Sequence, residues 1–316
     1  MPSGLEKSLA LQQEVLPQHS LTRLVHRFMR SESGWLKNAQ ISTVGRLAGI
    51  DFSEARSADP GDYKTFNAFF TRELKEGARP LDPDPGALLS PCDGRISECG
   101  ALDDGRILQA KGHDYSIGAL LADDPVCADL RNGEFWTIYL SPRDYHRVHM
   151  PLAGTLRRMI YVPGKLYSVA PYTVRQVPGL FAANERIVCV FDTDFGPFVQ
   201  VLVGAMLVAS MDTVWAGTVT PAAERTLQRT TYAPGDVRLE RGEEMGRFNM
   251  GSTVISILPP GVIAPSSESL PASNDAVRMG QRIANLVPRG TVDPTARLSS
   301  ATQSDKSDPD PEGATS

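Results

Sequence analysis

The sequence lacks long apolar runs. The longest, residues 201–209, is far shorter than the roughly 20 residues that a transmembrane helix needs. Residues 1–10 contain no apolar stretch of signal-peptide length. We therefore expect neither a membrane-spanning helix nor a secretory leader, and we interpret residues 201–209 as a buried strand or strand pair.

Cysteine is also scarce, and its spacing excludes the common paired motifs. The four cysteines are Cys92, Cys99, Cys127 and Cys189, and no two of them form a CxxC pair. Without a leader, this spacing predicts free thiols in a reducing, cytoplasmic compartment.

Several signatures of other protein classes are missing. The absence of HxH, HExxH and paired CxxC motifs disfavours a metal centre, and the absence of GxSxG disfavours a serine hydrolase. The formal net charge of -5 argues against a nucleic-acid surface spread over the whole protein, so any anionic partner must be met locally. No repeat of fixed period is present.

What is present is an ordinary globular composition. A chain of 316 residues with 41% hydrophobic content can form one large domain with an appendage, or two domains. Residues 53–63 are polar and contain proline and glycine, which is typical of a linker. Beyond Val287 the chain is rich in Ser, Thr, Asp, Pro and Gly, which predicts a disordered tail.

The N-terminal part, residues 5–52, has a helical pattern. Ser20 is a good N-cap, and one apolar helix face follows it: Leu21, Leu24, Val25, Phe28 and Met29. Three arginines and one histidine share this stretch, namely Arg23, His26, Arg27 and Arg30. A second helix is expected around Trp35 to Leu47. Such a helix suits a membrane surface, but most amphipathic helices pack on their own domain, and the pattern alone favours packing.

The middle of the chain favours strands. We expect a short helix over residues 65–74 and another over residues 115–122. The expected strands are residues 95–102, 106–111, 134–140, 156–162, 186–192, 198–209 and 254–258. The turn at residues 194–197 predicts that the two strands beside it pair antiparallel.

The Gly251-Ser252 step carries a possible self-cleavage chemistry. Gly251 has no Cβ and so leaves its carbonyl open to the hydroxyl of Ser252. Attack by that hydroxyl converts the amide into an ester, and elimination of the ester leaves dehydroalanine, which hydrolyses to a pyruvoyl group and ammonia. Alone, a Gly-Ser dipeptide before an apolar strand is weak evidence, because a plain strand start looks the same.

Two further segments supply the partners that such a serine needs. A serine hydroxyl is a weak nucleophile until a base takes its proton, and a carboxylate can orient that base. Asp93, His149 and Ser252 can fill these roles, and His146 lies three residues before His149. Each has an ordinary alternative: a turn for Asp93, and a surface or metal-binding role for the two histidines.

Together, three segments resemble the phosphatidylserine decarboxylases of the bacterial, membrane-associated type. The segments are SPCDG at 90–94, YHRVHMP at 145–151 and MGST at 250–253. Further stretches that resemble the family are FNAFFTREL at 66–74, KGHDYSIGALL at 111–121, PGKLYSV at 163–169, FAANERIV at 181–188 and RGEEMGRF at 241–248. The resemblance covers about residues 16–286. Met250 stands where the family usually has leucine, a change of similar volume that should not prevent cleavage.

The resemblance implies a role for each residue of the site. Asp93 is the orienting carboxylate, His149 the base for self-cleavage, Ser252 the precursor of a covalent pyruvoyl cofactor, and His146 a residue acting in decarboxylation. Gly251 and Ser252 form the cleavage site, which yields a β chain of residues 1–251 and an α chain of residues 252–316 that stay associated. No metal is expected. The amine of phosphatidylserine would form a Schiff base with the pyruvoyl group, and the products would be phosphatidylethanolamine and CO2.

The resemblance also implies an architecture and a location. The fold class is α+β, with N-terminal amphipathic helices and a mainly antiparallel β catalytic core. We expect a helical membrane-association region over residues 1–58, a catalytic domain over 59–287 and the tail over 288–316. The location is peripheral, on an anionic membrane surface at the cytoplasmic side of the cell membrane, and a homodimer is left open. The alternatives are a pyruvoyl decarboxylase of a soluble amino acid and a non-catalytic lipid-binding homologue.

Overall fold

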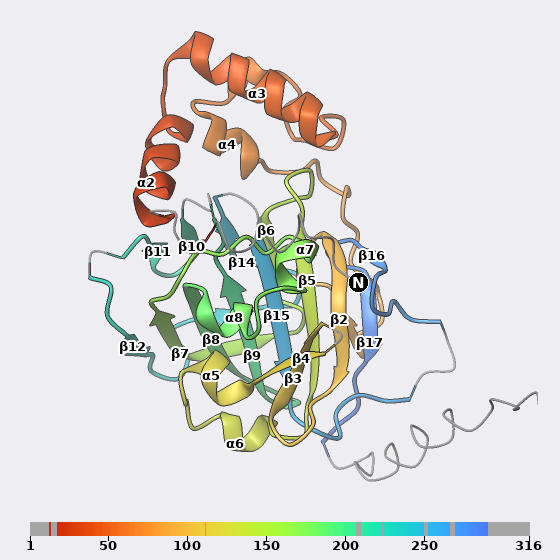
Figure 1. Cartoon of the computed structure of the whole chain (residues 1–316). Coiled ribbons are helices and arrows are strands. Elements are labelled where there is room, and N and C mark those ends of the chain that lie inside the picture. The colour runs from red at the N-terminus through yellow and green to blue at the C-terminus, as the bar shows by residue number, and fades with distance from the viewer. Residues whose placement is uncertain are drawn as a thin grey trace, which may run out of the picture.

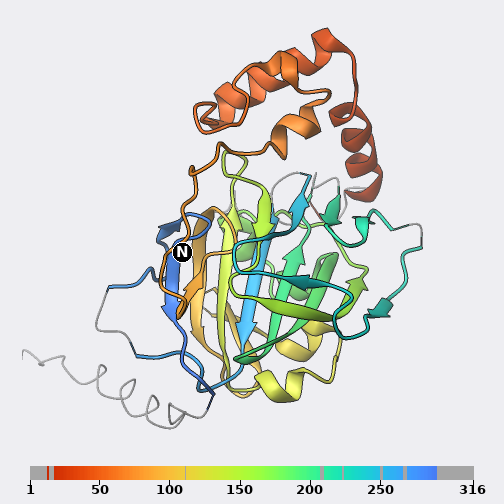
Figure 2. The same ribbon diagram turned by 180° about the vertical axis from the view of Figure 1, so that it is seen from behind.

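The computed structural model describes residue 13 and residues 18–110, 112–206, 210–222, 224–249, 252–265 and 269–289. One large antiparallel sheet dominates them (Figures 1 and 2). Its strands, in spatial order, are β12 (Gln228–Thr231), β7 (Gly154–Val162), β8 (Arg186–Thr193), β9 (Gly196–Val203), β15 (Ser252–Leu258), β5 (Glu134–Leu140), β2 (Gly94–Ala101) and β16 (Ala276–Val277), and β13 (Arg238–Leu239) also pairs with β7. Every residue of the central strand β15 is buried, which explains why its sequence is apolar without strict alternation.

Three smaller sheets accompany the large one. The first has the order β11 (Gly217–Thr220), β10 (Met211–Thr213), β14 (Glu244–Phe248) and β6 (Arg147–His149). The other two are the pairs β1 (Ala87–Leu89) with β17 (Arg282–Asn285), and β3 (Arg106–Ala110) with β4 (His113–Ser116). One continuous hydrophobic core joins the large sheet to the first of these and to the helices α5 (Ile117–Leu121), α6 (Cys127–Leu130), α7 (Pro171–Val174) and α8 (Leu180–Ala183).

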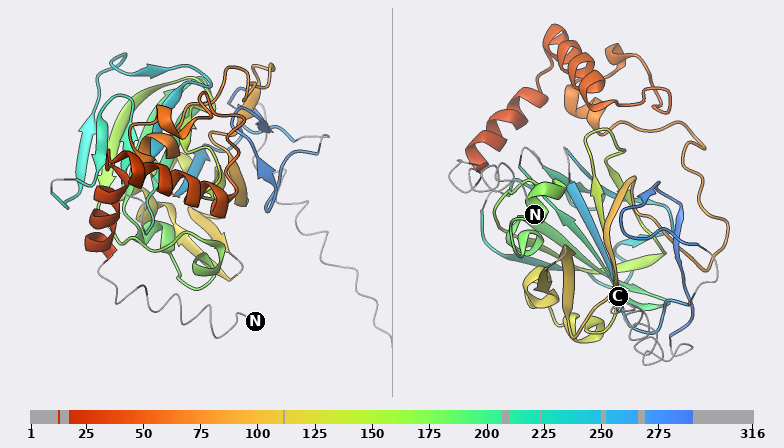
Figure 3. Two further views of the ribbon diagram at one scale, coloured as in Figure 1. Left: turned by 90° about the horizontal axis from the view of Figure 1, so that it is seen from above. Right: turned by 45° about the vertical axis from the view of Figure 1, so that its right-hand side comes forward.

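The N-terminal helices lie over one end of the sheets (Figures 1 and 3). They are α2 (Gln18–Met29), α3 (Gly34–Ala48), the 3-10 turn η1 (Pro60–Asp62) and α4 (Phe66–Phe70). A second hydrophobic cluster joins α3 to α4 through the buried residues Ile41, Ile50, Phe66, Phe69 and Phe70. Gly45 lets the Phe52 ring approach the α3 backbone, since a Cβ there would lie 2.8 Å from that ring. These helices therefore have a core of their own.

Most of the strand predictions are confirmed, as is the α+β class with a mainly antiparallel core. The hairpin of β8 and β9 pairs antiparallel through the predicted turn. The helix expected over residues 115–122 was too long, because His113–Ser116 pairs with β3 and only Ile117–Leu121 is helical. The helix expected over residues 65–74 ends at Phe70. Residues 290–316, and with them nearly all of the predicted tail, lie outside the described residues.

The exposed side of the N-terminal helices is more apolar than packing alone predicts. Leu24 and Phe28 of α2 are 53% and 51% exposed. Trp35 and Leu47 of α3 are 76% and 84% exposed. The expectation from pattern alone, that this apolar face is covered by the protein itself, is therefore wrong for Leu24 and Phe28.

Within the described part of the chain, every helix is too short or too polar to cross a bilayer.

Candidate active site

Ser252 is the first residue of β15 and lies at the end of the sheet. It pairs with Leu140, the last residue of β5, and it is fully buried. Its Oγ has no hydrogen-bond partner among the described residues. A buried hydroxyl without a partner is uncommon in a folded protein. Thr253 and Thr137 share this state, so Ser252 is singled out by its place at the start of β15 as well as by its unpaired hydroxyl. Met250 and Gly251 lie outside the described residues, so the geometry of the expected cleavage bond is not described.

Asp93 lies at the same end of the sheet, on the other side of β5. It directly precedes β2, whose Arg95 pairs with Tyr139 of β5. Strands β2 and β15 both run antiparallel to β5, so the start of each meets the end of β5. The sheet topology therefore brings two residues that are far apart in sequence, Asp93 and Ser252, to opposite sides of one strand end.

His149 lies in β6, beside the segment that carries Asp93. Its backbone N–H donates to the carbonyl of Pro91 at 2.8 Å. Its Nδ1 lies 2.8 Å from the carbonyl oxygen of Gly242, and its Nε2 lies 3.1 Å from the hydroxyl of Tyr145. Because a carbonyl only accepts, Nδ1 carries the proton and Nε2 presents its lone pair to Tyr145. His149 thus has the tautomer that a general base needs.

Burial keeps His149 neutral. Desolvation lowers its pKa, while the carbonyl of Gly242 and the nearby charges of Glu244 and Asp93 oppose that shift. A neutral imidazole can take up a proton near neutral pH, as the proposed base must.

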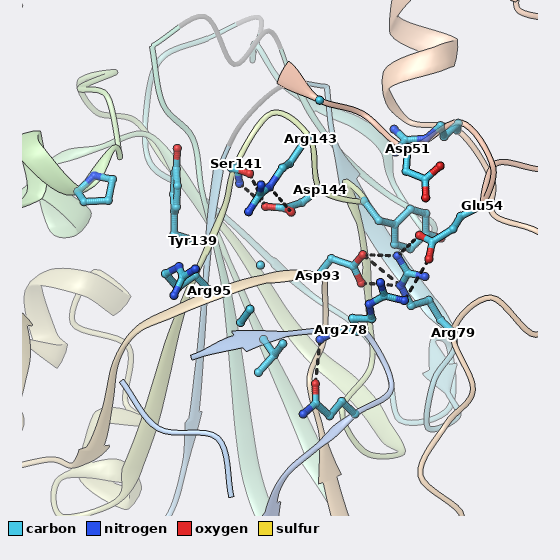
Figure 4. Close-up of a pocket in the computed structure, with 18 residues that line it drawn as sticks. Asp51, Glu54, Arg79, Asp93, Arg95, Tyr139, Ser141, Arg143, Asp144 and Arg278 are labelled. Atoms are coloured by element: carbon cyan, nitrogen blue, oxygen red, sulfur yellow. Dashed lines mark hydrogen bonds and ion pairs between the residues drawn. The ribbon is translucent and has the colours of Figure 1, made fainter. Parts of the chain in front are cut away.

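The carboxylate of Asp93 binds Arg79 rather than His149. Arg79 Nε lies 2.8 Å from Oδ1 of Asp93, and Arg79 Nη2 lies 2.6 Å from Oδ2 (Figure 4). The backbone N–H of Met279 donates to the same Oδ1 at 2.9 Å. Arg79 also binds Glu54 at 2.7 Å. The sequence interpretation missed Arg79, and no motif would have paired it with Asp93.

His146 is fully buried and stacks on Phe70 of α4. The two ring centroids are 4.1 Å apart and the rings are inclined by 23°. Neither ring nitrogen of His146 has a well-formed hydrogen bond to a described residue. Burial and then the charge of Arg72 lower the pKa of His146 to about 3, and the carbonyls of Ser141 and Pro142 only partly oppose this. A histidine exposed to water has a pKa of about 6.5, and this apolar setting lowers it.

A cavity of about 520 Å³ is lined by Asp93, while Ser252, His146 and His149 do not contribute to its wall (Figure 4). Its wall includes Asp93, Tyr139, Ser141 and Tyr145, together with the arginines Arg72, Arg79, Arg95, Arg143 and Arg278. On one side it reaches Gly49 and Asp51, directly after α3. No group of histidine, cysteine and carboxylate side chains within the described residues is arranged to hold a metal ion.

Comparison with known proteins decides the family. The family model described as phosphatidylserine decarboxylase matches residues 66–285, and a second model, described as PSD, matches residues 9–48. The chain belongs to the phosphatidylserine decarboxylase family. A phosphatidylserine decarboxylase proenzyme of Pseudomonas fluorescens is 51% identical over 283 residues, which cover 88% of this chain and 97% of the relative.

Other relatives in the phosphatidylserine decarboxylase family agree. The proenzyme of Alkalilimnicola ehrlichii is 54% identical over 257 residues, covering 81% of this chain and 89% of the relative. The proenzyme of Xanthomonas campestris is 52% identical over 270 residues, covering 85% and 95%. The resemblance inferred from the three motifs is thereby confirmed, while the roles of individual residues stay predictions.

Proposed function

We propose that this chain decarboxylates phosphatidylserine to phosphatidylethanolamine after cutting itself between Gly251 and Ser252. The family membership supports the reaction, and the relatives' description as proenzymes supports a processing step. The observation that carries the proposal is the buried Oγ of Ser252, which has no hydrogen-bond partner among the described residues. Ser256 of the same strand is hydrogen-bonded to Gln200 at 2.9 Å, whereas Thr253, like Ser252, has no partner for its hydroxyl among the described residues.

The cut converts Ser252 into the cofactor in three balanced steps. Its Oγ attacks the preceding carbonyl, the C–N bond breaks and an ester forms. Loss of the α proton of residue 252 then breaks its Cβ–O bond, and the β chain, 1–251, leaves with a carboxylate. Finally one water enters and one ammonia leaves, so the α chain, 252–316, begins with a pyruvoyl group. His149 is the base: the lone pair on its Nε2 accepts from Tyr145 in this structure, and the serine hydroxyl takes the place of Tyr145 when the cut occurs.

A pyruvoyl group fits the start of β15. The position is buried, and no described side chain competes for the oxygen of Ser252. Its backbone pairs with β5 at Leu140, and β9 pairs with the strand from Thr253 onward. When formed, this group supplies an electron sink for the bond to the departing carboxylate. His146 then acts as a neutral imidazole, because its pKa is about 3, and its ring N–H can donate a hydrogen bond at the reacting centre while the other ring nitrogen accepts one. The negative charge of Asp93 raises the pKa of His149, and Arg79 fixes the position of the Asp93 carboxylate.

The exposed apolar side chains on α2 and α3 support a location at a membrane surface. Leu24, Phe28, Trp35 and Leu47 are all at least half exposed. Basic residues on α2 add attraction to anionic lipids, at about 1 kcal/mol for each near the surface. We propose a peripheral location on the cytoplasmic face of the cell membrane, with the β and α chains associated. A homodimer would be compatible with it.

Two alternatives compete with this function. A pyruvoyl decarboxylase of a soluble amino acid would not need Trp35 and Leu47 exposed on α3. A non-catalytic lipid-binding homologue would not need Asp93, His149 and Ser252 at one end of the sheet. Both observations favour the phospholipid decarboxylase.

Two assays test the proposal. Ser252→Ala should give one uncut chain that releases no CO2 from phosphatidylserine in mixed micelles. Ser256→Ala, which removes another buried hydroxyl of the same strand, is the matched control and should still be cut and active. Equal CO2 release from free L-serine and phosphatidylserine would favour the soluble-substrate alternative, and a fully cut but inactive protein would favour the lipid-binding one.

A further inference from the structure

We propose that the cavity beside Asp93 binds the phosphodiester of the lipid headgroup, and that Arg72 is the residue that pairs with it. This inference rests on the proposed function, because it places the part of phosphatidylserine that does not react. It adds a substrate-recognition residue outside the three catalytic segments.

Arg72 is a buried cation whose donors are not used by the protein. Only 4% of its surface is exposed, and it lies in the wall of the cavity. Its Nε and Nη1 have no hydrogen-bond partner among the described residues. Its guanidinium carbon lies 5.5 Å from the centroid of the Phe69 ring, a contact that holds the group without pairing its charge. A buried charge with unpaired donors is costly, so this site is built to receive an anion.

The other arginines of the cavity are either paired or open to solvent. Arg79 binds Asp93 and Glu54, and Arg278 also binds Glu54, at 3.0 Å. The side chain of Arg143 is 64% exposed and lies 3.9 Å from Asp144. Arg95 is exposed and donates to the carbonyl of Asn274.

The carboxylates of the cavity also have partners other than Arg72. Asp93 and Glu54 bind Arg79, Asp144 accepts from the N–H and hydroxyl of Ser141, and Asp51 accepts from the N–H of Ser53 at 2.7 Å. Arg72 is therefore the buried arginine in this wall that an incoming anion can neutralise.

The chemistry of decarboxylation decides which anion Arg72 holds. The substrate carries two, the carboxylate and the phosphodiester. The carboxylate loses its charge as CO2 forms, so a cation paired with it would stabilise the ground state more than the transition state and slow the reaction. The phosphodiester keeps its charge throughout, so pairing it with Arg72 strengthens binding without opposing the reaction. A guanidinium also matches a phosphate with two parallel hydrogen bonds.

The position of the cavity agrees with a lipid headgroup. At one side it reaches Gly49, two residues after the exposed Leu47 of α3. At the other it includes Tyr145, whose hydroxyl lies 3.1 Å from Nε2 of His149. A headgroup with its acyl chains toward α3 would thus pass Arg72 on the way to the catalytic histidines.

Kinetics of the processed enzyme give the first test. Arg72→Gln should raise the KM for phosphatidylserine in mixed micelles about 10- to 100-fold and change kcat less than about threefold, as expected when one charge-assisted pair is lost from uniform binding. The KM of Arg72→Lys should lie between those of the original enzyme and Arg72→Gln. Arg131→Gln, which removes an equally charged but exposed side chain, is the control and should leave KM unchanged. A KM for Arg72→Gln within about twofold of the original would overturn the proposal.

Soluble fragments of the substrate identify the anion that Arg72 binds. A second variant, Arg72→Lys, provides the test if Arg72→Gln does not fold. Glycerophosphoethanolamine carries the phosphodiester without the carboxylate, and L-serine the carboxylate without the phosphodiester. In the uncut Ser252→Ala chain, adding Arg72→Lys should weaken calorimetric binding of glycerophosphoethanolamine about 10-fold and leave that of L-serine unchanged. The reverse pattern would assign Arg72 to the carboxylate. Inorganic phosphate binding as tightly as the fragment would reduce the cavity to a general anion site, and either result overturns the proposal.

These results separate the two proposals. If the original chain is uncut or releases no CO2, the proposed function fails, while fragment binding to the Ser252→Ala chain still tests Arg72. If the chain is cut and active but neither KM nor fragment binding depends on Arg72, only this inference fails.

Discussion

Arg79 forms a bidentate ion pair with Asp93, with Nε 2.8 Å from Oδ1 and Nη2 2.6 Å from Oδ2. The two side chains are only 6% and 9% exposed. The carboxylate expected to orient His149 is thus fixed by an arginine, while the carbonyl of Gly242 orients the imidazole. In this arrangement Asp93 acts on His149 through its charge rather than through a hydrogen bond.

Removing Arg79 should therefore destabilise the protein and slow its processing. Arg79→Gln leaves Asp93 and Glu54 without their shared cation, and we expect a loss of about 3 kcal/mol in the free energy of unfolding, measured in urea on the uncut Ser252→Ala chain. Arg56→Gln breaks an exposed ion pair with Glu73 and should cost less than about 1 kcal/mol. Equal losses for the two variants would show that the Asp93 pair contributes no more than a surface pair.

His149 should control the rate of self-cleavage. Replacing it with alanine removes the proposed base, and we expect cleavage at least about 100-fold slower, followed by mass spectrometry of freshly made chain. Tyr145→Phe removes only the hydroxyl that occupies Nε2, so this variant should still be cut. A block in Tyr145→Phe as strong as that in His149→Ala would instead make the tyrosine part of the proton path.

His146 should separate cleavage from turnover. We expect His146→Asn to be cut normally and to lose most CO2 release from phosphatidylserine, because the residue is proposed to act only in decarboxylation. Unimpaired turnover would refute that role.

The buried His146 also makes stability depend on pH, with a definite sign. Its pKa is about 3 in the folded chain and about 6.5 when unfolded, so between these values the unfolded chain binds the extra proton and stability falls as pH falls. The free energy of unfolding can be measured in urea on the uncut Ser252→Ala chain between pH 6 and 4. When His146→Asn is added, this free energy should fall less steeply as the pH falls, by up to about 1.4 kcal/mol per pH unit. An unchanged slope would show that His146 already carries its proton when folded.

Membrane attachment should depend on the exposed apolar side chains of α3. The double variant Trp35→Ser with Leu47→Ser should reduce flotation with anionic liposomes about 10-fold or more at unchanged stability. The control replaces two apolar residues exposed elsewhere, Leu108 and Leu227, and should float normally. Point variants are better than deleting the first 50 residues, because that deletion would remove Ile41 and Ile50 from the cluster around Phe69. Unchanged flotation of the double variant would exclude α3 as the anchor.

Local patterns in the sequence predicted the strands and the family, but not the contacts that build the site. Alternation and β-branched residues located Glu134–Leu140, and a Gly-Ser step before an apolar run located Ser252. The pairing of Arg79 with Asp93 depends on how the segment after α4 returns past β2, and no local pattern encodes that path. The exposure of Phe28 and the burial of Arg72 likewise depend on which elements cover them.

The expected chemistry of His146 shows the same limit. From its residue type alone, a histidine titrates near neutral pH. Burial, to which the stacked Phe70 ring contributes, and the nearby charge of Arg72 lower its pKa, and both arise from the tertiary packing of α4 and the residues after it. A residue's type can be read from the sequence, whereas its protonation state follows from what packs around it.

The most direct test of self-cleavage is the intact mass of the purified protein under denaturing conditions. We expect two chains that meet at Gly251 and Ser252, with the C-terminal chain lighter by one ammonia than a chain that starts with serine. A single full-length mass, persisting under conditions that allow maturation, would contradict it.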